Sequence, residues 1–163
     1  MTPSDGPPCL RSAVLVGLLT AGVLAMSPAA ATTSRVDDTG TVVSDAVVPM
    51  RWKQLLPGPA ADHAVQASLR VAVRLNTLRW IHQPIRLYMA LAPAAGSAPV
   101  HASWKTQGRW LPGSLRSGGR ALVFEGVAGS ALMEEALDLA LQTDGRALAS
   151  LQSLQFYFEI DTP

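Results

Sequence analysis

Three dipeptides in this chain join an arginine to a tryptophan, and their residue types are suited to binding a ligand. They are Arg51-Trp52, Arg79-Trp80 and Arg109-Trp110. A guanidinium next to an indole can hold a sugar or an anion by stacking and hydrogen bonding together. Adjacent residues of a strand point to opposite faces, however, so we expect Trp52 and Trp80 to face inward.

Trp110 is the best candidate of the three, because Gly108, Pro112 and Gly113 predict a loop around it. A large apolar side chain in a loop usually covers something. We therefore predict a surface on neighbouring loops that binds an anionic glycan or a small ligand. Its predicted residues are Arg109, Trp110, Arg116 and Arg120.

The histidines and the cysteine do not have the spacing of a metal site. His63, His82 and His101 follow one another at intervals of 19 residues, and no HExxH sequence occurs. The only cysteine is Cys9, near the N-terminus. We therefore predict no metal ion and no cofactor.

Residues suited to hydrolysis are present but scattered. No serine lies in a Gly-x-Ser-x-Gly turn, and Asp62 beside His63 is not a triad, because adjacency in sequence does not orient the groups. Four carboxylates can form an acid–base couple only if the fold brings two of them into a cleft: Glu134, Glu135, Glu159 and Asp161. We predict that the chain is not an enzyme, and a hydrolase is the alternative.

Charge is divided unevenly along the chain. Residues 51–120 contain ten arginines and lysines and one acid, whereas residues 121–163 contain seven acids and one arginine. In one interpretation the two groups pair across strands; in the other the arginines form a patch for an anionic partner. Nucleic acid is not expected, because the net charge is only +1. The residues expected to pair are Arg70, Arg74 and Arg86 with Glu125, Asp138 and Glu159.

Alternation of apolar and polar residues predicts the elements that position these groups. Leu69, Val71, Val73 and Leu75 recur at every second position, which is the period of a strand with one buried face. Four further segments show this period: 84–91, 100–105, 121–127 and 154–160. The last is predicted to be a central strand, because it has the most aromatic residues. Trp104 shares the apolar face of its segment and is predicted to be core.

Residues 131–142 fit both a helix and a strand. Positions 132, 135, 136 and 139 form a helical face, whereas the leucines at 137, 139 and 141 alternate. We predict a helical or irregular turn at 132–135 followed by a strand, with a helix throughout as the alternative. Thr143-Asp144-Gly145 then predicts a hairpin-type turn.

Five or six strands joined by glycine- and proline-rich turns predict an all-β fold. We predict an antiparallel β-sandwich, immunoglobulin-like or similar, with room for one short helix. A small barrel and an α+β sheet covered by a helix are the alternatives. Residues 51–163 are predicted to form a single β domain, and residues 32–50 an extended leader or an edge strand.

The first 31 residues have the pattern of a cleavable export signal. Arg11 precedes an uncharged apolar run, Ala13–Met26, and small residues follow at Ala29 and Ala31. The run has 14 residues, whereas a helix needs about 20 to cross a bilayer. We predict cleavage near Ala31, no retained transmembrane helix and no disulfide, because Cys9 leaves with the signal. The processed chain is then expected in the periplasm or at the cell surface.

Composition and organisation together predict a function in binding. Arginine outnumbers lysine eleven to two, which is typical of a bacterial genome rich in G and C. An exported β-sandwich with a Ser/Thr/Val-rich leader resembles subunits and accessory proteins of bacterial surface appendages, in which a strand of one subunit completes the sheet of another. The resemblance implies protein–protein interaction or envelope assembly, with another envelope protein as the partner. An anionic glycan is the alternative partner. Deletion of Thr32–Val48 is expected to alter oligomerisation more than folding.

Overall fold

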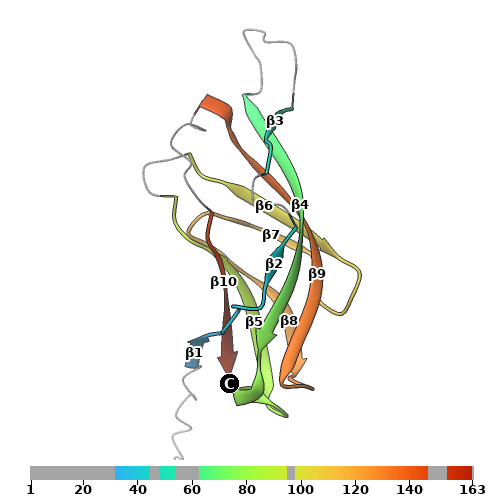
Figure 1. The fold of residues 1–163 in the computed structure, drawn as a ribbon. Coiled ribbons are helices and arrows are strands. Elements are labelled where there is room, and N and C mark those ends of the chain that lie inside the picture. The colour runs from blue at the N-terminus through green and yellow to red at the C-terminus, as the bar shows by residue number, and fades with distance from the viewer. Residues whose placement is uncertain (1–31, 45–47, 54–62, 95–97, 147–153, 163) are drawn as a thin grey trace, which may run out of the picture.

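The chain folds as two antiparallel β-sheets packed face to face (Figure 1). The structure is a computed structural model that describes residues 32–44, 48–53, 63–94, 98–146 and 154–162. The predicted signal, residues 1–31, lies outside the described residues. The described elements are β1 (Thr32–Arg35), β2 (Val42–Val43), β3 (Arg51–Trp52), β4 (Ala64–Asn76), the 3-10 helix η1 (Leu78–Trp80), β5 (Pro84–Leu91), β6 (His101–Thr106), β7 (Gly113–Arg116), β8 (Arg120–Val127), β9 (Leu132–Asp144) and β10 (Phe156–Thr162).

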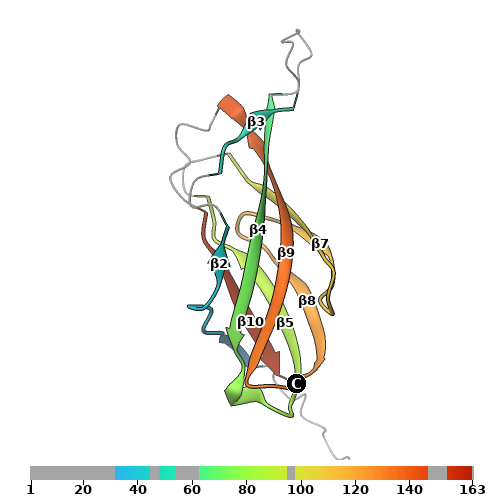
Figure 2. The ribbon, with the colours of Figure 1, turned by 45° about the vertical axis from the view of Figure 1, so that its right-hand side comes forward.

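The strand order confirms the predicted all-β antiparallel sandwich. Sheet A has the order β1-β10-β5-β8, and sheet B has the order β2-β4-β9-β6-β7, with β3 also paired to β4. The long strands β4 and β9 cross the molecule side by side, and β10 and β5 lie in the opposite sheet (Figure 2). β10 lies between β1 and β5, so the prediction of a central last strand is confirmed.

The helical turn expected at 132–135 is wrong, because β9 is a strand from Leu132 onward. The reason is its partner: β4 offers a ladder that pairs Leu75 with Met133 and continues without a break to Asp144. The local sequence fits a helix almost as well as a strand, and pairing with the distant strand β4 decides between them. The hairpin expected after Thr143 is also wrong, because β9 belongs to sheet B and β10 to sheet A.

The leader contributes to both sheets and to the core. β1 forms the edge of sheet A beside β10, and β2 pairs with β4 at the edge of sheet B. β3, which follows the leader, also pairs with β4. Between β1 and β2, Val36 is only 2% exposed. Instead of one edge strand, the leader therefore forms two short strands, β1 in sheet A and β2 in sheet B.

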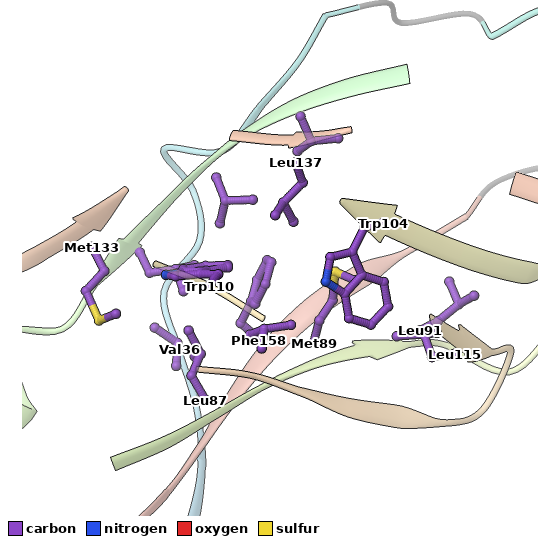
Figure 3. Packing of buried hydrophobic residues seen from close by; sticks show 14 of the residues in the cluster. Val36, Leu87, Met89, Leu91, Trp104, Trp110, Leu115, Met133, Leu137 and Phe158 are labelled. Carbon is purple, nitrogen blue, oxygen red and sulfur yellow. The ribbon is translucent and has the colours of Figure 1, made fainter. Parts of the chain in front are cut away.

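The interior between the sheets is filled by aliphatic and aromatic side chains (Figure 3). Trp110 and Phe158 pack edge to face with ring centroids 5.8 Å apart. Trp104 is buried as predicted, and its indole N–H donates to the carbonyl of Leu111 at 2.9 Å. Trp80 is also buried, as expected. Trp52 lies opposite the buried Val65, on the inward-facing side of sheet B as predicted, but it remains 48% exposed at the edge of the sheet.

Candidate functional site

The structure corrects the predicted role of Trp110. The residue does lie in a loop, between β6 and β7, but its side chain is 5% exposed and points into the core. Glu135, on the core-facing side of β9, accepts the backbone N–H groups of Arg109 at 3.0 Å and Trp110 at 3.4 Å. The loop thus folds back over the interior, and its indole covers the core rather than a ligand.

Gly108 allows this loop to approach β9. A Cβ atom at this position would lie 2.1 Å from Oε2 of Glu135. Only a residue without a side chain therefore fits while Glu135 holds the two backbone N–H groups.

The four residues of the predicted loop surface do not come together. Arg109 is exposed in the β6–β7 loop, and Trp110 is buried. Arg116 lies at the end of β7 in sheet B, where its Nε donates to Nε2 of His101. Arg120 begins β8 in sheet A and binds two carboxylates there. The predicted site is therefore not assembled, because its residues belong to different sheets and faces.

Arg120 is the centre of an ion-pair network on the outer face of sheet A. Its guanidinium lies over the ring of Tyr88 at 4.3 Å and reaches Glu159 at 3.2 Å and Asp161 at 3.1 Å. Asp161 also accepts a hydrogen bond of 2.7 Å from the hydroxyl of Thr33. Burial raises the pKa of Asp161, but the hydrogen bonds from Thr33 and Arg120 outweigh it and the pKa is lowered overall. The network joins β1, β10, β5 and β8.

The four carboxylates that were candidates for catalysis all have structural partners. Glu134 forms an ion pair with Arg74 at 3.1 Å, and Glu135 accepts the loop N–H groups described above. Glu159 and Asp161 share Arg120. These contacts account for all four side chains as parts of the fold.

Arginines from the first half of the chain pair with acids from the second half, as one interpretation of the uneven charge predicts. Arg70 lies 2.8 Å from Asp138, and Arg86 lies 2.9 Å from Glu125. In both pairs the two residues are directly opposite each other on neighbouring strands. Each hydrogen bond raises the pKa of its arginine. Basic strands from the first half of the chain therefore neutralise acidic strands from the second half.

Two histidines that are far apart in sequence line one depression on the outer face of sheet B. His63 and His101 border a hollow of ≈510 Å³ together with Gln142, Asp144 and Arg146. The arginine lies 2.6 Å from Asp144 and lowers the pKa of that carboxyl to about 2, chiefly by hydrogen bonding. Among the described residues, no three histidine, cysteine or acidic side chains gather as a metal site. The sequence does not predict that the two histidines lie close together, because their proximity depends on the register of β4, β9 and β6.

A larger groove opens between the sheets on the side of β1 and β2. Its volume is ≈690 Å³. The walls come from both sheets and are mostly aliphatic or aromatic. Among its lining residues are Val43, Val48, Met50, Leu69, Val71, Met89, Leu139, Leu141, Leu154, Phe156 and Phe158. Charged lining residues, Arg35 and Asp38, belong to the leader.

The edge of β10 beside this groove is only partly covered. β1 pairs with β10 from Thr162 back to Glu159, and the N–H of Val36 adds a bond to the carbonyl of Phe158. The backbone N–H and C=O of Phe156 are the next groups that point to this side. Leu91, opposite Phe156 on β5, forms its backbone hydrogen bonds with Gly118 and Gly119 instead of with Phe156. Within the described part of the chain, no backbone group pairs with Phe156 there.

Fold and surfaces together define an antiparallel two-sheet β-sandwich with an apolar inter-sheet groove. Comparisons with protein-family models, curated proteins and solved structures found no match to this chain. The described residues contain no helix of the length and apolarity needed to span a membrane.

Proposed function

We propose that this chain is an exported, non-catalytic β-sandwich module that binds another protein of the cell envelope or cell surface. In this proposal the inter-sheet groove receives an extended segment of the partner. The observation that carries the proposal is the apolar groove of ≈690 Å³, which opens beside a partly unpaired strand edge.

Backbone pairing and side-chain burial favour an extended occupant. An added strand places alternate side chains on one face, and its backbone satisfies the edge to which it binds. Here Phe156 presents its backbone N–H and C=O toward the open side, while Leu69, Leu139 and Phe158 line the adjacent groove. A segment with an apolar residue at every second position matches both features.

The charge of the groove argues for the same class of occupant. Apart from Arg35 and Asp38 of the leader, the lining side chains described are uncharged. A charged side chain placed among them would lose its hydration without a partner. The segment that enters is therefore expected to be uncharged along its inward face.

Processing after Ala31 is compatible with this fold. β1 begins at Thr32, so cleavage there removes no described strand. N-terminal sequencing of the protein from the periplasmic or extracellular fraction should start at or near Thr32. Recovery of the protein from the cytoplasm with its first residues intact would contradict the export part of the proposal.

The leader is a poor target for testing assembly, because its removal would damage the fold. Deleting Thr32–Val48 would remove β1 and β2 and the buried Val36. We therefore expect the deletion to lower stability as well as to change any oligomerisation. Substitutions inside the groove separate binding from folding more cleanly.

The test uses a capped peptide of alternating valine and threonine and follows backbone amide signals by NMR. We expect the peptide to shift the signals of Phe156 and of groove residues, and N-methylation of alternate peptide nitrogens to abolish the effect. Leu69→Asp, in the groove, should prevent binding. Ser68→Asp is the matched control, because Ser68 is the neighbouring residue on the opposite, exposed face. Equal binding by both variants would rule out the groove as the binding site.

A further inference from the structure

Five exposed side chains form a row across the outer face of sheet B. Residues directly opposite each other in an antiparallel ladder share one face. The ladders place Arg116 opposite His101, His101 opposite Gln142, Gln142 opposite Gln66, and Gln66 opposite Arg51. These residues belong in order to β7, β6, β9, β4 and β3. We call them the basic row.

The basic row and its surroundings have an excess of positive charge. The row contains two arginines and no acid. Acids elsewhere on this face already have cations: Asp138 binds Arg70, and Asp144 binds Arg146. In the described parts of the chain, no carboxylate lies within ion-pair distance of Arg51, Lys105 or Arg116.

A hollow lies alongside the row because the next register positions carry small side chains. Ser103 lies opposite both Ser114 and Ala140, and Ala140 lies opposite Ser68. The hollow at these positions has a volume of ≈590 Å³ and is bordered by Lys105 on its far side. Arg70 and Asp138 also line the hollow, but they pair with each other, so Lys105 supplies its unpaired charge. Ser68 and Ser103 add hydroxyl groups.

The dimensions require a long ligand. Neighbouring strands lie about 4.8 Å apart, so the four intervals from β7 to β3 separate the backbones of Arg116 and Arg51 by roughly 19 Å. A single small anion cannot contact both arginines. Arg116 uses its Nε to bind His101, so both terminal nitrogens of its guanidinium remain free to bind an oxyanion.

We infer that the outer face of sheet B binds an acidic polysaccharide that lies along the basic row. Carboxylate or sulfate groups pair with Arg51, Lys105 and Arg116, and sugar hydroxyls bond to the amides of Gln66 and Gln142. The row has no aromatic side chain on which a nucleobase would stack and no apolar side chain for an acyl chain. Its amides and hydroxyls match a sugar chain instead.

The test measures binding of polygalacturonate and heparin by isothermal titration calorimetry, with neutral dextran as the uncharged comparison. We expect binding of an acidic chain that weakens as salt is added, and no binding of dextran. Arg116→Gln and Arg51→Gln should each weaken binding about tenfold, the effect expected when a hydrogen bond to a charged group is lost. These residues are exposed, and thermal melting of each variant checks that it is folded.

Arg109→Gln is the matched control, because it removes the same charge from an exposed arginine outside the row. It should bind like the unaltered protein. An equal loss with Arg109→Gln would show unspecific attraction and overturn the inference. Tighter binding of a DNA oligonucleotide or of anionic vesicles at the same ionic strength would assign the face to those ligands instead. Val43→Asp, which alters the groove but not the hollow, should keep polysaccharide binding, so this result is independent of the groove.

Discussion

Arg120 and Asp161 lie 41 residues apart in sequence, and Nη2 of the arginine is 3.1 Å from Oδ2 of the aspartate. To reach this carboxylate, the arginine extends from edge strand β8 across Tyr88 of β5 to β10. Thr33 of β1 binds the same carboxylate from the other edge. One network therefore spans all four strands of sheet A.

The first prediction concerns this network. Arg120→Gln should lower the free energy of unfolding by about 1 kcal/mol, because Glu159 and Asp161 lose their charged hydrogen bonds while solvent screens part of the effect. Urea denaturation measures it. Arg70→Gln is the control: its partner is 49% exposed, and its urea midpoint should stay unchanged. An equal loss in both variants would mean that the network has no special role.

The second prediction is a pH dependence from Asp161. Its pKa in the folded protein lies below the ordinary 3.8, since hydrogen bonds from Thr33 and Arg120 outweigh the effect of burial. A carboxyl with a lowered pKa adds stability above its unfolded pKa and loses it as pH falls through the folded value. The urea midpoint should therefore fall as the pH drops below 3.8, and it should fall less in Asp161→Asn. Parallel curves for the two proteins would refute this.

The third prediction uses the same principle at a site that NMR can follow directly. The carboxyl of Asp144 should titrate with a pKa of about 2, because Arg146 donates hydrogen bonds to it from its side chain and its backbone. In Arg146→Gln the pKa should rise toward 3.8. A titration unaffected by this substitution would show that the ion pair does not form in solution.

The fourth prediction tests the loop that holds Trp110. Gly108→Ala should destabilise the protein by about 1 kcal/mol, because the new methyl group displaces Glu135 and the N–H groups of Arg109 and Trp110 lose their acceptor. Gly129→Ala is the control, since a Cβ at Gly129 meets nothing within 4 Å. If both variants unfold at the same urea concentration, Glu135 does not hold the loop.

The fifth prediction separates a core role from a binding role for Trp110. Trp110→Ala should lower the free energy of unfolding by about 3–5 kcal/mol, the range for truncating a buried aromatic residue. Trp52→Ala, at a side chain 48% exposed, should have a smaller effect. Calorimetric melting of both variants decides this. A fully stable Trp110→Ala protein would return Trp110 to the list of binding candidates.

The sequence by itself determined most of the long strands and which of their side chains face inward. The alternation from Leu69 to Leu75 appears as the buried face of β4, and Arg70 on the other face meets an acid as expected. Both results are local, because the pleat of a strand turns successive side chains to opposite faces whatever its neighbours are. Opposite charges on outward faces then pair wherever strands adjoin.

Tertiary structure alone decided the features that depend on neighbours. Residues 132–135 became strand because β4 pairs along their length, and Trp110 turned inward because Glu135 binds its loop. The groove and the basic row exist only through strand order and register, which join residues from strands distant in sequence. Side-chain direction is a property of the local backbone, whereas register is set by long-range pairing over a shared core.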